Sequence, residues 1–253
     1  MHTRAKIALL SIPLIPFGCA SPQPTVGETR IETSDAPAHL TPIFASEVFS
    51  PGPRAKTYRV VDVRAAETIG TESREISAPE PDGSWTVTTR FTDAEGRTAP
   101  ARISTLRTRE DGAVELLEVT TPRSDEPDAE IMRFRYEPPV VMMPASLDAA
   151  AIFEHTAEMI ELALADPAEE RGRGTQTRRL RLISAGGDAR AFEVELETRY
   201  RGAVDTRFSE TRVDTARGVL SETSERRLKV MGLTIKSHSR LYELEENHAE
   251  TDQ

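Results

Sequence analysis

The sequence has few of the residues on which catalytic and metal sites commonly depend. Cysteine occurs once in 253 residues, and the five histidines are His2, His39, His155, His238 and His248. None has the His-x-x-His or His-Glu-x-x-His spacing that holds zinc in many enzymes, so a metal site has no support. The chain also lacks the Gly-x-Ser-x-Gly motif of many hydrolases and the glycine-rich loop of nucleotide-binding folds. We therefore expect no metal, no cofactor, no catalytic residue and no enzymatic activity.

Positive charge is in short supply as well. Lys and Arg number 32 against 42 Asp and Glu, which gives a formal net charge of −10 at pH 7. Proteins that bind nucleic acid depend on clustered basic residues, so we predict no nucleic-acid partner. One basic group is expected to form a solvated or ion-paired strand face among acidic neighbours. Its members are Arg171, Arg173, Arg178, Arg179 and Arg181.

The apolar stretch at residues 7–17 is shorter than the ~20 residues that a membrane-spanning helix needs. It follows a basic start and precedes Gly18 and Cys19, an order that is typical of signal peptides. It resembles bacterial lipoprotein signals, in which a small residue precedes the cysteine that is lipidated and becomes the mature N-terminus. The resemblance implies removal of residues 1–18, lipidation of Cys19 and anchoring to a membrane of the bacterial cell envelope, facing the periplasm. The alternative is an ordinary secretory signal with an incidental cysteine.

Apolar and charged residues alternate strictly over residues 192–200, which read Phe-Glu-Val-Glu-Leu-Glu-Thr-Arg-Tyr. This alternation indicates a β-strand with one buried face and one face in water. Residues 85–91 repeat the alternation and end in the same Arg-aromatic pair, and further segments match in the same order along the two halves of the chain. We predict a mainly β protein with little helix. Its antiparallel meander sheets would come from two tandem repeats, as one curved sheet or two packed sheets.

The matched segments also predict how the chain is divided. The predicted regions are a lipoprotein signal peptide at 1–18, a flexible tether at 19–53, a β repeat at 54–137, a Pro-rich crossover with a short helix at 138–155, a second β repeat at 156–246 and a disordered tail at 247–253. Pro138 and Pro139 favour a crossover because proline has no N–H for a central strand. Residues 147–165 are rich in Ala and Glu. They predict either a short helix from about 146 to 155 followed by a strand, or one long helix.

The linker between the two β-rich halves has the order Pro-Pro, apolar run, Pro over residues 138–144. Behind a lipoprotein signal, this arrangement resembles uncharacterised bacterial envelope lipoproteins with antiparallel meander sheets, a likeness that covers most of the body and implies no activity. More loosely, the chain resembles the half-barrel lipid-carrier lipoproteins of the envelope. That family has covering helices, which only residues 147–165 could provide here.

Aromatic residues on the buried faces of the predicted strands are the candidates for a binding site. Packing in a core is the ordinary explanation for them, but an unfilled curved sheet would make them line an apolar groove. These residues are Trp85, Phe91, Phe134, Phe192 and Tyr200.

Three functional hypotheses remain at this point. The first is a non-catalytic module that holds an apolar ligand such as a lipid, or an envelope protein, on its concave face. The second is a structural or interaction protein with a filled core. The third, a carboxylate-based hydrolase, is the least supported, because the alternation already explains Glu193, Glu195 and Glu197 as a solvent-facing row.

Overall fold

The computed structural model describes residues 25–33, 41–149, 151–186 and 189–245. The predicted signal peptide at 1–18, the lipidation site Cys19 and the predicted tail at 247–253 lie outside the described residues. Strands make up 68% of the structure and helices 2%, so the prediction of a mainly β protein with little helix is confirmed. In the described ranges, no helix is long and apolar enough to cross a membrane.

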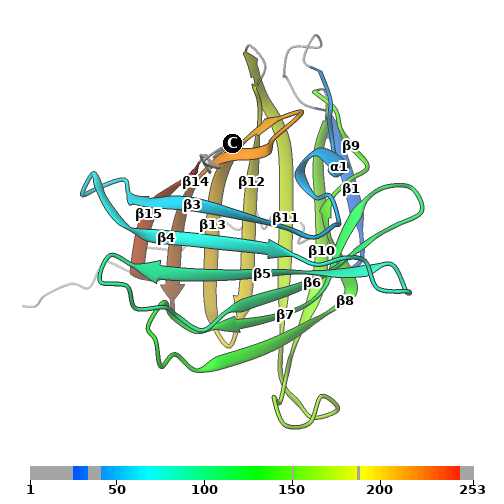
Figure 1. The fold of residues 1–253 in the computed structure, drawn as a ribbon. Helices are drawn as coiled ribbons and strands as arrows, with labels where there is room; N and C mark the ends of the chain where they lie inside the picture. The colour runs from blue at the N-terminus through cyan, green and yellow to red at the C-terminus, as the bar shows by residue number, and fades with distance from the viewer. Residues whose placement is uncertain (1–24, 34–40, 150, 187–188, 246–253) are drawn as a thin grey trace, which may run out of the picture.

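Twelve antiparallel strands of the described chain close into a barrel (Figure 1). They are β3 (Arg54–Asp62), β4 (Glu67–Ile76), β5 (Ser84–Asp93), β6 (Arg102–Thr108), β7 (Val114–Pro122), β8 (Ile131–Met143), β10 (Ala151–Leu162), β11 (Glu170–Gly186), β12 (Ala189–Tyr200), β13 (Ala203–Asp214), β14 (Gly218–Val230) and β15 (Leu233–Leu244). Two long-range pairings complete the ring, β15 with β3 and β8 with β10. The predictions of a curved sheet and of two packed sheets are therefore wrong, because closure pairs both edges of the sheet.

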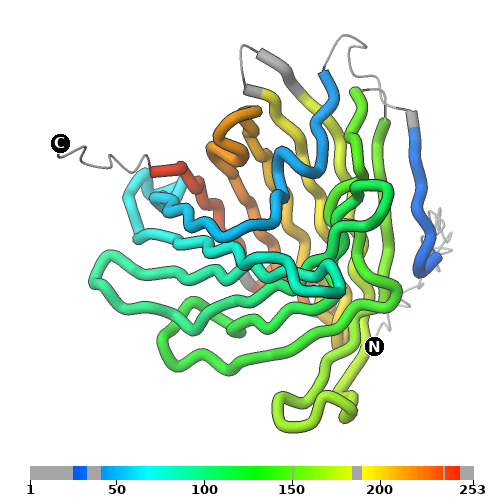
Figure 2. The backbone as a smooth tube through the Cα atoms, turned by 45° about the vertical axis from the view of Figure 1, so that its right-hand side comes forward, coloured from blue at the N-terminus to red at the C-terminus, as the bar shows by residue number. Residues whose placement is uncertain are grey.

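The barrel consists of two halves, β3 to β8 and β10 to β15, with six consecutive strands each (Figure 2). In Figure 1 the first six strands run across the view and the second six run close to vertical, so the halves cross at a steep angle. The two segments with the clearest alternation, 85–91 and 192–200, lie in β5 and β12. The strand order in each half agrees with the order of the matched sequence segments, and the tandem repeat itself stays a prediction.

The described parts of the predicted tether are packed against the barrel. β1 (Thr29–Thr33) pairs with the first half of β10, and β8 pairs with the second half of the same edge. β2 (Ile43–Phe44) pairs with β9 (Ser146–Leu147), and the short helix α1 (Ala45–Val48) follows. The flexible tether at 19–53 therefore needs correction at 29–33 and 43–48, where the chain is strand and helix.

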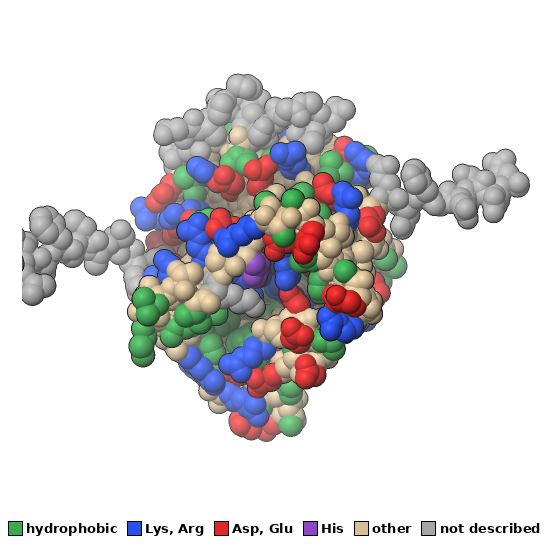
Figure 3. Space-filling model, turned by 90° about the vertical axis from the view of Figure 1, so that its left-hand side faces the viewer, with side chains coloured by type: hydrophobic (Ala, Val, Ile, Leu, Met, Phe, Trp, Pro, Cys, Tyr) green, Lys and Arg blue, Asp and Glu red, His purple; other side chains and the backbone are tan. Residues whose placement is uncertain are grey.

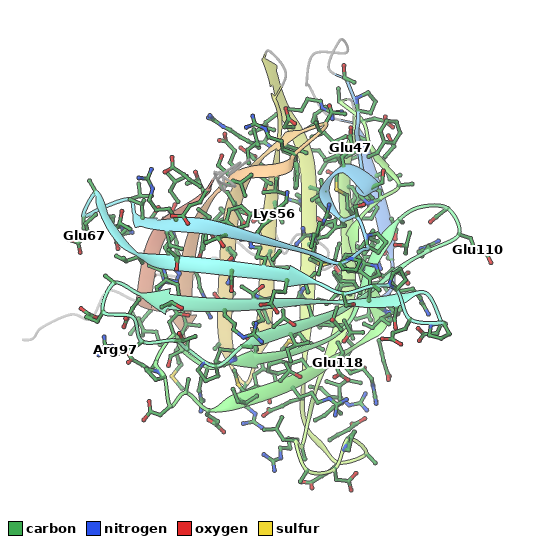
Figure 4. The ribbon with its side chains drawn as sticks, in the orientation of Figure 1. Glu47, Lys56, Glu67, Arg97, Glu110 and Glu118 are labelled. Carbon is green, nitrogen blue, oxygen red and sulfur yellow. The ribbon has the colours of Figure 1, made fainter. Side chains whose placement is uncertain are left out.

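An ion pair holds α1 on the barrel (Figure 4, where Glu47 is labelled). Arg190 of β12 donates from Nη2 to Glu47 Oε1 at 2.6 Å and from Nη1 to the carbonyl oxygen of Pro42 at 2.6 Å. Ile43 and Ala45 are fully buried beside it. The segment 42–48 thus covers one end of the barrel.

The segment predicted as a Pro-rich crossover is the second half of β8. Pro138 and Pro139 follow Glu137, which is the last residue of β8 that pairs with β10. Proline is tolerated there because β8 leaves β10 at that point and needs no N–H for that partner.

The helix predicted for residues 146–155, and the alternative helix over 147–165, are both wrong. Residues 146–147 form β9, and β10 runs from Ala151 to Leu162. Within β10, Phe153, Ala157 and Met159 point to the barrel interior and are buried. Because β10 pairs with β11 on one edge and with β1 and β8 on the other, sheet pairing outweighs the helix propensity of Ala and Glu.

One apolar core fills the end of the barrel beneath α1. It contains side chains from both halves and from the covering segment. Its buried members include Ile43, Trp85, Leu106, Val114, Leu116, Phe134, Val140, Met143, Leu147, Phe153, Leu180, Leu182, Phe192 and Val213. The opposite end has a different lining, described below.

The outer face of the barrel carries ion pairs between neighbouring strands. Arg173 pairs with Glu158 at 3.0 Å, Arg179 with Glu154 at 2.5 Å and Arg181 with Glu193 at 2.5 Å. These three arginines therefore form the ion-paired face predicted for their group. Arg178 differs, because it points into the barrel.

Candidate functional site

A cavity of about 300 Å³ lies inside the barrel, between the apolar core and the open end. Figure 3 looks toward the side of the molecule where the β3–β4 turn and β15 lie, and it shows a hollowed surface there. Six arginines from both halves of the barrel line the cavity: Arg74, Arg102, Arg123, Arg207, Arg226 and Arg240. The interior at this end is therefore basic, although the whole chain is acidic.

Strand alternation brings these arginines to the inner face. Arg207 of β13 lies opposite Arg226 of β14, which in turn lies opposite His238 of β15. Residues directly opposite each other in neighbouring strands share a face of the sheet, so all three point into the barrel. The adjacent residues Phe208 and Arg227 point outward and are exposed.

Carboxylates neutralise Arg74. Its Nε lies 2.6 Å from Glu72 Oε1, and its Nη2 lies 3.3 Å from Glu222 Oε2. The guanidinium also stacks 4.5 Å from the ring centre of Tyr58. Burial alone would lower the pKa of Arg74, but Glu72 and Glu222 raise it above its ordinary value.

Carboxylates also hold three further arginines, and the first of them, Arg123, pairs with Glu130 at 2.7 Å. Arg226 donates to both oxygens of Asp205 at 2.6–3.0 Å, which is the bidentate geometry of a strong Arg-carboxylate pair. Arg240 donates to Asp125 Oδ2 at 2.6 Å and lies 5.5 Å from the ring centre of Phe91.

Arg102 and Arg207 form no ion pair with any described carboxylate, although both line the cavity. Burial lowers the pKa of Arg102, and the nearby charge of Arg207 lowers it further. Two like charges thus face the same space without a direct ion-pair partner, although the nearby carboxylates of Glu72 and Glu222 offset part of the lowering at Arg102. Such a pair is costly unless an anion joins it, because a desolvated charge needs a partner.

Arg178 of β11 is a third cation close enough to Arg102 and Arg207 to be affected by their charge. It is buried, and its Nε donates to the carbonyl oxygen of Met142 at 2.9 Å. Burial lowers its pKa to about 10, and Arg207 and Arg102 lower it as well, while Glu222 raises it. The positive electrostatic potential of Arg102 and Arg207 therefore reaches from the cavity to Arg178 on β11.

The five aromatic candidates from the sequence do not surround one groove. Trp85, Phe134 and Phe192 lie in the packed core, and Trp85 is only 1% exposed. Tyr200 is half-buried and meets Phe134 edge-on, with the ring centres 5.9 Å apart. Phe91 alone among the five lines the cavity.

Sequence reasoning missed the arginines of the cavity. Arg226 and Arg227 are adjacent, so alternation requires one of them to face the interior, and this was the available signal. His238 and Glu222 also line the cavity. Among the described residues, His, Cys, Asp and Glu form no group of three or more that could hold a metal ion.

Comparison with known protein-family models, with curated proteins and with solved structures finds no match. The cavity and its arginines are therefore the basis for a functional argument.

Proposed function

We propose that the protein is a non-catalytic binding protein whose barrel holds a small ligand with a carboxylate or phosphate group. The observation that supports this most strongly is the pair of arginines, Arg102 and Arg207, which face the cavity without a carboxylate partner among the described residues. Guanidinium groups bind carboxylates and phosphates through parallel hydrogen bonds, and these bonds gain strength where water is excluded.

The ion-paired arginines make the proposal more specific. Arg74, Arg226 and Arg240 have carboxylate partners, which fix the positions of their guanidinium groups and neutralise their charge. An incoming anion would therefore gain most from Arg102 and Arg207. This division between positioned and unpaired arginines would confine the anionic group to one part of the wall.

The rest of the wall suggests a ligand with an apolar part. Val87, Phe91 and Pro100 line the same cavity as the arginines. A volume of about 300 Å³ lies at the lower end of the range of roughly 300–1,000 Å³ for ligand pockets. The best match is a small amphiphile, with its anionic end at Arg102 and Arg207 and a short apolar body along Phe91. The apolar ligand expected from the sequence thereby acquires a charged group.

The second hypothesis, an interaction protein with a filled core, is favoured by one observation. The aromatic residues expected to line a groove are largely used in packing, as Trp85, Phe134 and Phe192 show. That packing leaves the arginine-lined end open. Carboxylates do converge in the cavity, but Glu72 and Glu222 converge on Arg74 as its ion-pair partners.

The proposal also covers the membrane anchor of the protein and the tandem repeat of its two halves. Gly18 and Cys19 support lipidation of Cys19 and anchoring to a membrane of the bacterial cell envelope. Labelling with an alkyne fatty acid should mark the wild type and leave Cys19→Ser unmarked, and equal labelling would contradict the anchor. The equal number and order of strands in the two halves support the tandem repeat of 54–137 and 156–246.

Native mass spectrometry of the full chain tests the ligand proposal. The wild type, purified from a bacterial envelope, is expected to carry a small anionic mass. The double variant Arg102→Gln/Arg207→Gln should lose that mass, while Arg227→Gln, on the outer face of β14, should retain it. Retention of the mass by the double variant, or a bare wild type, would overturn the proposal.

A further inference from the structure

The turn between β14 and β15 exposes an unusual group of apolar side chains. Met231 is 93% exposed, Leu233 72% and Ile235 61%. Met231 and Gly232 form the turn with positive φ values of 50° and 81°. A two-residue turn with positive φ at both positions matches the twist of the flanking strands, so the tip is a well-formed hairpin.

The charge around this tip contrasts with the rest of the chain. Residues 226–242 contain five Arg and Lys and no Asp or Glu, whereas acidic residues outnumber basic ones over the whole chain. Lys229 lies near the apolar residues at the end of β14 and is exposed. The hairpin thus combines an apolar end with basic residues behind it.

The hairpin lies at the open end of the barrel. Arg226, His238 and Arg240, from the same two strands, line the cavity. The neighbouring β3–β4 turn is joined to β15, where Arg64 Nη2 donates to Ser237 Oγ at 2.8 Å. Figure 3 shows hydrophobic side chains gathered beside the hollow of this face. The apolar tip is therefore part of the rim around the cavity.

We propose that this hairpin docks the barrel on a membrane with anionic headgroups, with Met231, Leu233 and Ile235 in the interfacial region. Apolar side chains bind there through buried area, and flanking Lys and Arg gain from the negative surface. The chemistry of the segment matches both parts of such a surface. Docking would bring the mouth of the cavity to the bilayer, so the ligand would be an anionic amphiphile exchanged with that membrane, an inference that rests on the proposed function.

A lipid surface fits the tip better than a folded partner. A specific protein interface buries on the order of 800 Å² on each side, with shaped and complementary packing. Three side chains at the end of a narrow hairpin offer a small area, whereas a bilayer accepts an apolar tip without a matching shape. A second copy of this chain is the remaining alternative and is an outcome of the test.

The test places a fluorophore that responds to polarity at the tip of the full chain. Cys19 is the only cysteine, so Cys19→Ser with Met231→Cys gives one labelling site. The matched control is Cys19→Ser with Ala216→Cys, in the exposed turn at the other end of β14. A label at 231 should shift to the blue on vesicles of phosphatidylcholine with phosphatidylglycerol, and less on phosphatidylcholine alone. The label at 216 should remain in water on both, and about 0.5 M salt should reduce the shift at 231.

Three results would overturn the docking proposal. The first is a label at 231 that stays in water on the anionic vesicles, and the second is an equal shift at 216. The third is a shift at 231 that appears without vesicles and grows with protein concentration, which would identify a second copy of the chain as the occupant.

A second measurement separates this proposal from the function on which it rests. Met231→Ser/Leu233→Ser should lower vesicle binding by about tenfold or more, because two exposed apolar side chains lose their transfer gain. The same variant should bind decyl phosphate in vesicle-free solution as the wild type does. If the wild type does not bind decyl phosphate but the label at 231 still inserts into vesicles, the ligand proposal is rejected and the docking proposal is retained.

Discussion

The two ends of the barrel have interiors of opposite character, although the same strands form both. At the end under α1, Trp85, Phe192 and Leu182 are buried in one apolar core. At the open end, strands of both halves present arginines to a cavity, and Arg102 and Arg207 have no carboxylate partner among the described residues. The difference indicates that one end supplies stability and the other gives up stability for a basic site. Proteins commonly store such unfavourable charge where they bind ligands.

The largest expected effect is at the apolar end. Trp85→Ala should lower the free energy of unfolding by about 3–5 kcal/mol, because it removes a large side chain that is 1% exposed. Phe91→Ala, on the same strand but at the cavity, should lower it by only about 1 kcal/mol, since Phe91 is half-buried. Urea unfolding measures both variants. Equal losses of unfolding free energy in the two variants would contradict the conclusion that the apolar end supplies most of the stability.

The next effect concerns the cover on the apolar end. Arg190→Leu should destabilise the protein by about 3 kcal/mol, because it leaves Glu47 partly buried without its partner. Limited proteolysis should then cut near α1 before the rest of the barrel. The exposed pair of Arg181 and Glu193 provides the control, and Arg181→Leu should change stability by less than about 0.5 kcal/mol. Unchanged protection of α1 in Arg190→Leu would contradict the role given to this ion pair.

At the open end, removal of a positive charge should raise the free energy of unfolding, whereas the substitutions at the apolar end lower it. Arg207→Gln should raise the stability of the ligand-free protein by about 1 kcal/mol, because it relieves repulsion with Arg102. Thermal unfolding at low and high salt measures this gain, which should shrink as salt screens the charges. Arg226→Gln is the contrasting variant and should destabilise, since it leaves Asp205 without its partner. Destabilisation by Arg207→Gln would remove the evidence for an unfavourable charge at this end.

The smallest effect is a dependence on pH from the interior wall. His155 is buried, its Nδ1 accepts a hydrogen bond from the N–H of Val141 at 3.4 Å, and burial lowers its pKa below 6.5. The folded state therefore favours the neutral ring, so the unfolded chain binds more protons below pH 6.5 and stability falls with acidification. Urea unfolding at about pH 7 and about pH 5.5 should show this loss, and His155→Gln should reduce it. An identical pH dependence in His155→Gln would assign the loss to other groups.

The strands were predictable where one face is apolar and the other is charged. Residues 85–91 and 192–200 alternate in this way, and both lie in the strands expected. Barrel closure was not predictable, because the pairings of β15 with β3 and of β8 with β10 join segments without a local turn. The helix expected at 146–155 failed for a related reason, since only long-range pairing makes β10 a strand.

The candidate site was predictable only in part. Phe91 was placed correctly on an inward face, and it lines the cavity. Sequence reasoning assigned apolar residues to the inside and charged residues to water. That rule cannot assign Arg226 and Arg227, because both faces of β14 are polar there. Which arginine faces inward follows from the register with His238, and the sequence does not contain that information.

The most direct test of the account is the affinity of the cavity for an anionic amphiphile. Isothermal titration of decyl phosphate into the full chain, without vesicles, compares the wild type with Arg102→Gln/Arg207→Gln and with Arg227→Gln. The account predicts binding by the wild type, at least about tenfold weaker binding by the double variant, and no change for Arg227→Gln. Equal affinity of the wild type and the double variant would show that the unpaired arginines do not form a binding site.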